Sequence, residues 1–261
     1  MNPELYLHPC GDRLKKWLTE LKKRQVTYLI SGSDPDYVEW VAGYCLGNDW
    51  KNYFDYVVCA SKKPGFFSGK RPFRQYLVGR NSVGVEDEDI DIDVDLPANA
   101  SAIYVHGNWY TNSLLLLRNV NNVFIICRNQ LKCSMAEYCG VDYPKCLYFG
   151  DHLIQDVLAA DLSRLDVVAM VEELAAENQT SQGLLNSKRW GSFFYDQQGS
   201  FNCSEGTMNT LWANLVGKHA RLCISYMEEL CAYPANHGFT FTHNGHNTKF
   251  LGFLPSLLCL N

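Results

Sequence analysis

Two carboxylates near the middle of the chain have a spacing that suits a metal-dependent reaction. The run 147–150 is apolar and ends in glycine, Asp151 follows it directly, and Asp156 comes five positions later. This pattern predicts a buried strand, a tight turn and a helix whose first turn carries acids. Ligands of open α/β sheets collect at the carboxyl ends of strands, where two acids can hold Mg2+ beside a phosphate. The alternative is that Asp151 caps the helix and Asp156 is solvated.

Two further polar residues follow predicted strands in the same way. Ser31 closes the β-branched and aromatic run 26–30, and Lys63 follows the apolar run 53–60. If these strands are parallel, the hydroxyl, the lysine and the acids converge on one edge of the sheet. A hydroxyl donates a hydrogen bond to phosphate, a lysine offsets its charge, and a metal clamps an oxygen. Each residue also has a structural explanation, because Ser31 can satisfy a turn and Lys63 can be one exposed lysine among many.

The elements that must position these residues alternate along the chain. Apolar residues at helical spacing predict helices over 12–23 and 36–46, and Gly47 is a natural stop for the second. These helices alternate with the strands predicted above, and the apolar run 165–171 continues the rhythm. Such alternation predicts an α/β fold: a Rossmann-like, mostly parallel sheet with helices on both faces.

Composition excludes several classes of protein. The 261 residues are 47% hydrophobic and 20% charged, which is typical of a globular protein. A net charge of -5 without a basic stripe argues against a nucleic-acid partner. The longest apolar stretch, 114–127, is interrupted by Arg118 and is too short to span a membrane. Eleven cysteines without a Cys-x-x-Cys pair, together with no secretory pattern at the N-terminus, predict reduced thiols and a cytoplasmic location.

Three short motifs share their residue types and spacing with a known family. They are Ser31-Gly32-Ser33-Asp34 with Tyr37 downstream, Lys63-Pro64 followed by Phe66-Phe67, and Gly150-Asp151-His152 with Asp156. Together they resemble the second, third and fourth motifs of the haloacid-dehalogenase-type cytosolic 5'-nucleotidases. Supporting runs at 15–18, 46–49, 71–74 and 190–194 extend the resemblance over most of the chain, except about 80–145 and the last stretch.

The resemblance implies a Mg2+-dependent phosphohydrolase acting on a nucleoside monophosphate or another small phosphoester. It also implies a haloacid-dehalogenase-type sheet. The implied roles are phosphate binding by Ser31 and Lys63, substrate contacts by Ser33 and Asp34, and Mg2+ binding by Asp151 and Asp156.

One part of the family pattern has no counterpart in this sequence. The nucleophile of the family is the first Asp of an Asp-x-Asp-x-Thr/Val motif at the end of its first strand, and the second Asp is its general acid and base. Here the run Asp34-Pro35-Asp36 lies beyond Ser31, so neither carboxylate stands at a strand tip for in-line attack. The acidic run 86–95 repeats Asp-x-Asp, but we interpret it as a solvated insertion. We therefore expect the motif and most of the cap to lie upstream of Met1, with catalysis weak or absent in a truncated chain. The alternative is a non-catalytic nucleotide- or protein-binding pseudophosphatase.

The missing strand also has a structural consequence. In the family it is central, and the strands that here end in Ser31 and Gly150 flank it. Without it, two long sheet edges would be unpaired, which favours aggregation. We therefore expect the chain to be a truncated product or a fragment. There are two alternatives: a partner supplies the strand, or the two flanking strands pair directly.

We predict three regions along the chain. Residues 1–175 form a partial haloacid-dehalogenase-like core in which 80–145 is a poorly matched insertion, 176–189 form a polar linker, and 190–261 form an extension that packs on the core. The extension contains a helical pattern over 211–231. Its aromatic segment 239–241 could cover a neighbouring copy, so a homo-oligomer is possible.

Overall fold

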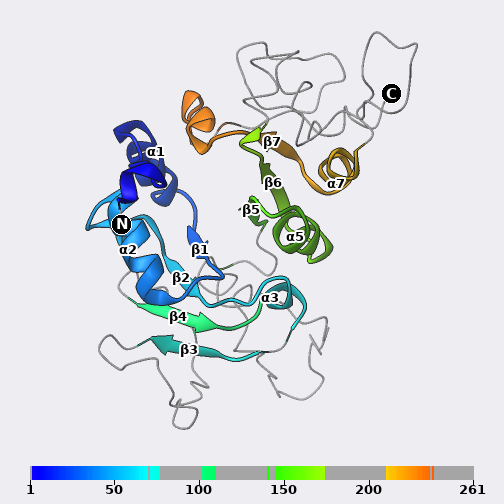
Figure 1. Cartoon of the computed structure of the whole chain (residues 1–261), viewed down its shortest axis with the longest axis horizontal. Helices are drawn as coiled ribbons and strands as arrows, with labels where there is room; N and C mark the ends of the chain where they lie inside the picture. The colour runs from blue at the N-terminus through cyan, green and yellow to red at the C-terminus, as the bar shows by residue number, and fades with distance from the viewer. Residues whose placement is uncertain are drawn as a thin grey trace. The chain divides into compact units, whose positions relative to one another are not determined.

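Two sheets organise the chain (Figure 1). The structure is a computed structural model that describes residues 2–69, 71–76, 102–109, 140, 145–173, 210–235 and 237. The chain divides into two units, Met1–Pro144 and Lys145–Asn261, each with its own sheet. No helix in the described ranges is long and apolar enough to cross a membrane.

The first unit contains a four-stranded sheet in the order β1-β2-β4-β3. Its elements are η1 (Pro3–Leu5), α1 (Asp12–Lys22), β1 (Tyr28–Ile30), α2 (Pro35–Leu46), η2 (Trp50–Tyr53), β2 (Tyr56–Cys59), α3 (Gly65–Ser68), β3 (Phe73–Tyr76) and β4 (Ile103–His106). Strands β1, β2 and β4 are parallel, and β3 runs antiparallel to β4 at the edge. Every residue of β2 is buried, as expected for an apolar central strand covered on both faces.

The helices of the first unit follow the predicted pattern. Helix α1 buries Leu14 and Leu18. Helix α2 ends at Leu46, and Gly47 follows with a φ of 104°. That left-handed backbone costs glycine nothing and other residues a good deal, which explains why the helix stops there. Both helix predictions are confirmed to within one residue.

The second unit contains three parallel strands in the order β5-β6-β7. Its elements are β5 (Leu147–Gly150), the π-helix η3 (Leu153–Leu158), α5 (Ala159–Leu162), β6 (Asp166–Met170), α7 (Leu211–His219), β7 (Leu222–Ile224) and η4 (Met227–Ala232). Helix α7 packs against η3. All three residues of β7 are buried.

The prediction of a helical pattern over 211–231 is wrong in its second half. Helix α7 ends at His219, β7 then pairs with β6, and η4 is a 3-10 helix. Three consecutive buried residues cannot all lie on one face of a helix, whereas a strand covered on both faces buries them all. Pairing with β6 therefore overrides the local periodicity.

The α/β prediction is confirmed at the level of parallel strands with helices. Strands β1 and β5 each lie at the end of their sheet's strand order, so each has one neighbour among the described strands. Within the insertion 80–145, the described residues 102–109 contribute β4 and the buried Trp109 to the first unit. The linker 176–189 lies outside the described residues, so the predicted domain boundaries stay predictions.

Candidate functional site

The turns that follow β1 and β2 are bonded to each other. Ser31 comes directly after β1, and its amide donates to the carbonyl of Val58 at 2.8 Å. In return, the amide of Ser61 donates to the carbonyl of Ser31 at 3.1 Å. The amide of Ala60 donates to the carbonyl of Ser33 at 2.8 Å. These backbone bonds form a rim at the carboxyl edge of the first sheet.

The side chain of Ser31 has a place in this rim and keeps a hydrogen-bond donor. Its Oγ accepts a hydrogen bond from the amide of Ser33 at 3.1 Å, and both serines are half-buried. Ser31 therefore does satisfy a backbone group of its turn, as the structural explanation proposed. Accepting that bond leaves the hydroxyl hydrogen able to point at a phosphate oxygen, because a hydroxyl both donates and accepts. The two roles are compatible.

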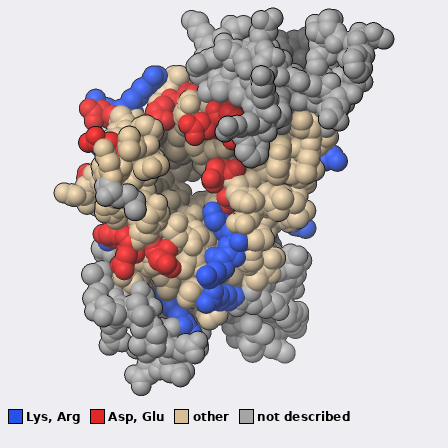
Figure 2. All heavy atoms as spheres, viewed as in Figure 1, with Lys and Arg blue, Asp and Glu red and all other residues tan. Residues whose placement is uncertain are grey.

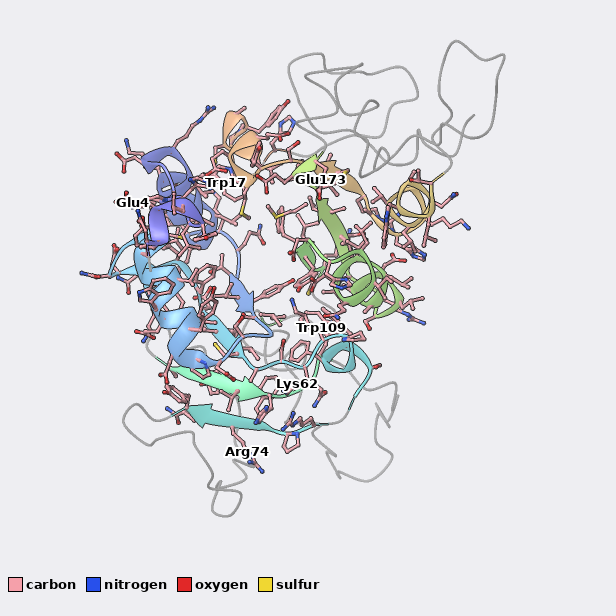
Figure 3. The ribbon with its side chains drawn as sticks, viewed as in Figure 1. Glu4, Trp17, Lys62, Arg74, Trp109 and Glu173 are labelled. Atoms are coloured by element: carbon pink, nitrogen blue, oxygen red, sulfur yellow. The ribbon has the colours of Figure 1, made fainter. Side chains whose placement is uncertain are left out.

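Lys63 lies on a turn whose backbone is unusual. Ala60 and Lys62 have φ angles of 48° and 50°, which side-chain-bearing residues rarely adopt. Such conformations persist where the surrounding structure enforces them, and they gather at ligand-binding sites. Lys63 is half-buried and precedes a cis peptide bond to Pro64. The turn thus carries two successive lysines past the end of β2; Figure 3 labels the first of them, Lys62.

Asp34 and Asp36 lie at the start of α2, not at a strand tip. Asp34 is the N-cap residue; its exposed side chain makes no capping hydrogen bond within the described residues. The carboxylate of Asp36 accepts a hydrogen bond from the hydroxyl of Tyr76 on β3. That this Asp-x-Asp run does not supply a nucleophile stays a prediction.

In the second unit, Asp151 and Asp156 have opposite environments. Asp151 follows β5 directly and is exposed, whereas Asp156 lies in η3 and is 2% exposed. The hydroxyl of Tyr148 donates to Oδ1 of Asp156 at 2.7 Å, and the amide of His152 donates to Oδ2 at 3.3 Å. A buried carboxylate requires such donors, since burial without them is costly.

The helix cap at this turn is a histidine. Nδ1 of His152 accepts hydrogen bonds from the amides of Ile154 and Gln155 at 3.3 and 3.2 Å. The alternative in which Asp151 caps the helix and Asp156 is solvated is therefore wrong on both counts. Asp151 is left with its carboxylate in solvent at the end of β5.

Gly150 permits the close approach of η3 to β5. A Cβ atom at this position would lie 2.3 Å from Cβ of Asp156, a distance that such atoms do not reach. The absence of a side chain at Gly150 thus lets the π-helix fold Asp156 back against the end of β5. The Gly-Asp pair in the motif has a steric reason as well as a chemical one.

The oxygen donors on this turn fit Mg2+. Mg2+ prefers oxygen ligands, keeps several waters, and is commonly bound by one or two carboxylates plus a substrate phosphate. Asp151 and Asp156 supply two carboxylates on one turn. Across the described residues, no group of three or more His, Cys, Asp or Glu side chains could hold a metal ion. Further ligands would have to be water or phosphate oxygens, or residues outside the described ranges.

The structure adds residues that sequence reasoning missed. His106 ends β4, has a φ of 66°, and places Nδ1 3.3 Å from the carbonyl oxygen of Ala60. Tyr148 is the donor that holds Asp156. A signal for His106 was present, because an apolar run followed by His-Gly at 103–107 has the same form as the run before Gly150.

The four central predicted residues form two pairs, one in each unit. Ser31 and Lys63 are on the joined turns of the first unit, and Asp151 and Asp156 are on one turn of the second. Ser31 and Asp151 directly follow β1 and β5, whereas Lys63 lies on the turn beyond β2 and Asp156 lies in η3. The meeting of the two pairs at one phosphate stays a prediction.

Comparisons with known proteins agree with these motifs. The sequence model of the 5' nucleotidase family matches residues 1–198. The chain is 26% identical over 280 aligned residues to 5'-nucleotidase domain-containing protein 1 of Bos taurus, covering 98% of this chain and 55% of that protein. The Homo sapiens protein of the same name is 27% identical over 283 aligned residues, which cover 98% of this chain and 56% of that protein. 5'-nucleotidase domain-containing protein 2 of Homo sapiens is 29% identical over 136 aligned residues, which cover 52% of this chain and 20% of that protein.

The chain thus spans about half the length of the curated relatives that it matches along nearly its whole sequence. The resemblance inferred from the three motifs is confirmed by the family match and by these relatives.

Proposed function

Because the chain belongs to the 5'-nucleotidase family, we propose that it binds the phosphate of a nucleoside monophosphate or another small phosphoester. The proposal includes a haloacid-dehalogenase-type arrangement, in which the two pairs of motif residues face one phosphate. The observation that supports it best is the turn after β5, where a glycine lets a buried, doubly bonded carboxylate lie beside an exposed one.

Each residue has a role that its environment supports. Ser31 donates its hydroxyl hydrogen to a phosphate oxygen, and Lys63 offsets phosphate charge, since charge-assisted hydrogen bonds are the stronger ones. Asp151 and Asp156 hold Mg2+, with Tyr148 and the His152 amide fixing the carboxylate of Asp156. Bound Mg2+ would neutralise phosphate charge and polarise the phosphorus–oxygen bond. Ser33 and Asp34, on the turn before α2, contact the rest of the substrate.

Hydrolysis by these 261 residues alone is proposed to be slow or absent. Among the described residues, the Asp-x-Asp run Asp34-Pro35-Asp36 lies at the start of α2 and not at a strand tip. Removing a nucleophile eliminates most of the rate but leaves groups that only bind phosphate in place. The second candidate function is therefore a binding protein that uses the same phosphate and Mg2+ residues in the cytoplasm.

The test measures binding and turnover separately. Binding of nucleoside monophosphates is followed by calorimetry with and without Mg2+, and phosphate release is measured on the same panel. Asp151→Asn removes one proposed Mg2+ ligand. Asp166→Asn is the matched control, because Asp166 is an exposed acid at the opposite end of the parallel strands.

We expect Mg2+ to tighten nucleotide binding in the wild type and in Asp166→Asn, but not in Asp151→Asn. Equal Mg2+ dependence in both variants would contradict the metal site. Ser31→Ala is expected to weaken nucleotide binding about tenfold, the cost of one hydrogen bond to a charged group. Rapid phosphate release that persists in Ser31→Ala would show that the site or the chemistry is different.

A further inference from the structure

A group of basic residues surrounds the end of β4 in the first unit. The group, here called the His106 cluster, consists of Lys62, Arg71, Arg74 and His106. Figure 3 labels Lys62 and Arg74, and Figure 2, drawn from the same side, shows lysine and arginine side chains in that region. The three sequence motifs and the phosphate site proposed above do not use Arg71, Arg74 or His106, although 71–74 is one of the runs that support the family resemblance.

The ring of His106 is oriented by two different partners. Nδ1 lies 3.3 Å from the carbonyl oxygen of Ala60, and Nε2 lies 3.4 Å from Nη2 of Arg71. A carbonyl oxygen can only accept, so Nδ1 carries the hydrogen and the neutral ring presents its Nε2 lone pair to the guanidinium. His106 is therefore an acceptor that aims Arg71.

The backbone around Arg71 is held at its far end as well. The side-chain amide of Asn108 donates to the carbonyl of Arg71 at 2.8 Å, and the amide of Gly107 donates to the carbonyl of Pro72 at 3.0 Å. Both Gly107 and Asn108 are buried. The side chain of Arg71 itself is exposed. A fixed backbone that carries an exposed guanidinium is suited to binding a ligand from solvent.

The charges around His106 are of one sign. Burial lowers the pKa of His106, and the charge of Arg71, followed by those of Arg74 and Lys62, lowers it further, while the Ala60 carbonyl opposes the shift. Among the carboxylates that the structure describes, none forms an ion pair with Lys62 or Arg71. Lys62 and Arg71 thus contribute positive charge beside His106 that no described carboxylate pairs with.

We propose that Arg71 and His106, together with Lys62, form a binding site for a phosphate-class oxyanion. The guanidinium matches the oxygen geometry of phosphate, since its donors form a planar fork. An incoming anion takes the place of His106 as the acceptor for Arg71. His106 then gains a proton and donates Nε2–H to the anion, so that binding takes up one proton.

This site goes beyond the phosphate and Mg2+ site proposed above. Ala60 links it to the rim, because its amide donates to Ser33 and its carbonyl accepts from His106. The ligand groups, however, are different: Ser31 and Lys63 are assigned to the rim, whereas Arg71 and His106 form the site at the end of β4. Free phosphate and the phosphate of an ester share the chemistry that the site recognises.

The test follows the ring nitrogens of His106 by NMR in the full chain, with the signals assigned from His106→Gln. Inorganic phosphate, sulfate and a nucleoside monophosphate are titrated at constant ionic strength against sodium chloride. We expect saturable shifts of the His106 signals and a pKa of His106 that rises when the anion is bound. Sulfate keeps its charge over this range, so tighter sulfate binding at lower pH would report the proton taken up by His106.

Three variants test whether phosphate binding depends on Arg71 itself and not on positive charge elsewhere in the chain. Arg71→Gln is expected to weaken phosphate binding at least about tenfold, and Arg71→Lys less, because lysine keeps the charge without the fork. The control Arg221→Gln removes an exposed arginine, paired with Asp166 in the second unit, and should leave binding unchanged.

Each result of these experiments either supports the His106 site or overturns it. Equal shifts with chloride, or wild-type phosphate affinity in Arg71→Gln, would overturn the proposal. Loss of the His106 response in Ser31→Ala would also overturn it, because the anion would then belong to the rim. A response to the nucleotide and not to inorganic phosphate would support the site and identify the ester as its source. Failure of this test leaves the Mg2+ comparison of Asp151→Asn and Asp166→Asn unaffected.

Discussion

The hydrogen bond between Tyr148 and Asp156 offers a direct test of how the second unit is built. Tyr148 is 5% exposed and Asp156 is 2% exposed, and the hydroxyl donates to the carboxylate at 2.7 Å. Tyr148→Phe deletes the hydroxyl and keeps the ring, so that packing is preserved. The carboxylate then retains its described bond to the His152 amide, at 3.3 Å.

The expected loss follows from the burial of Asp156. Hydrogen bonds to charged groups contribute about 1.5–3 kcal/mol, and a buried acceptor deprived of its donor cannot recover the difference from water. We expect Tyr148→Phe to lower the free energy of unfolding by about 2 kcal/mol. For a chain of this size, that corresponds to a decrease in Tm of about 4–8 °C.

The measurement is urea and thermal unfolding monitored by circular dichroism. Tyr37→Phe is the control, because it makes the same substitution at a residue that is 55% exposed. A double-mutant cycle with Asp156→Asn isolates the interaction, since residues in contact show coupling of about 0.5–3 kcal/mol. If Tyr148→Phe costs no more than Tyr37→Phe, or if the cycle shows no coupling, Asp156 is not held as the structure shows.

Three further predictions test other parts of the first unit. Gly107→Ala should lower the free energy of unfolding by about 3 kcal/mol or more, because φ is 73° and a Cβ would lie 1.9 Å from the Phe73 ring. The control is Gly43→Ala on α2, where a Cβ would meet no atom within 4 Å, and it should be neutral or stabilising. Urea unfolding measures both variants. Burial, and then neighbouring cations, lower the pKa of His106 from its ordinary 6.5, so the unfolded chain binds the proton more tightly. Unfolding near pH 7.5 and 5.5 should therefore show a loss of stability below about 6.5 that is smaller in His106→Gln. Burial raises the pKa of the Cys59 thiol to about 12, so thiol reagents should label it at about pH 8 only in unfolded chains, as mass spectrometry can check.

The helices and strand ends were readable from the sequence because their signals are local. The spacing of Leu14 and Leu18 predicts the buried face of α1, and Gly47 predicts the end of α2. The apolar runs before Ser31 and Asp151 predict β1 and β5, because a glycine or serine turn after such a run is a property of neighbouring residues. The three motifs, and with them the family, follow from the same short segments.

The tertiary structure decided which partners these segments find. Strand β7 exists because Leu222–Ile224 pair with β6, a contact that helical periodicity in 211–231 conceals. Asp156 is buried because Gly150 leaves room for η3 and Tyr148 supplies a donor, whereas in the sequence it is one more acid near a helix start. His106 contacts Ala60, 46 residues earlier, so no local pattern could reveal that it aims an arginine. Periodicity and turn residues act over a few positions, while burial and charge depend on residues that only folding brings together.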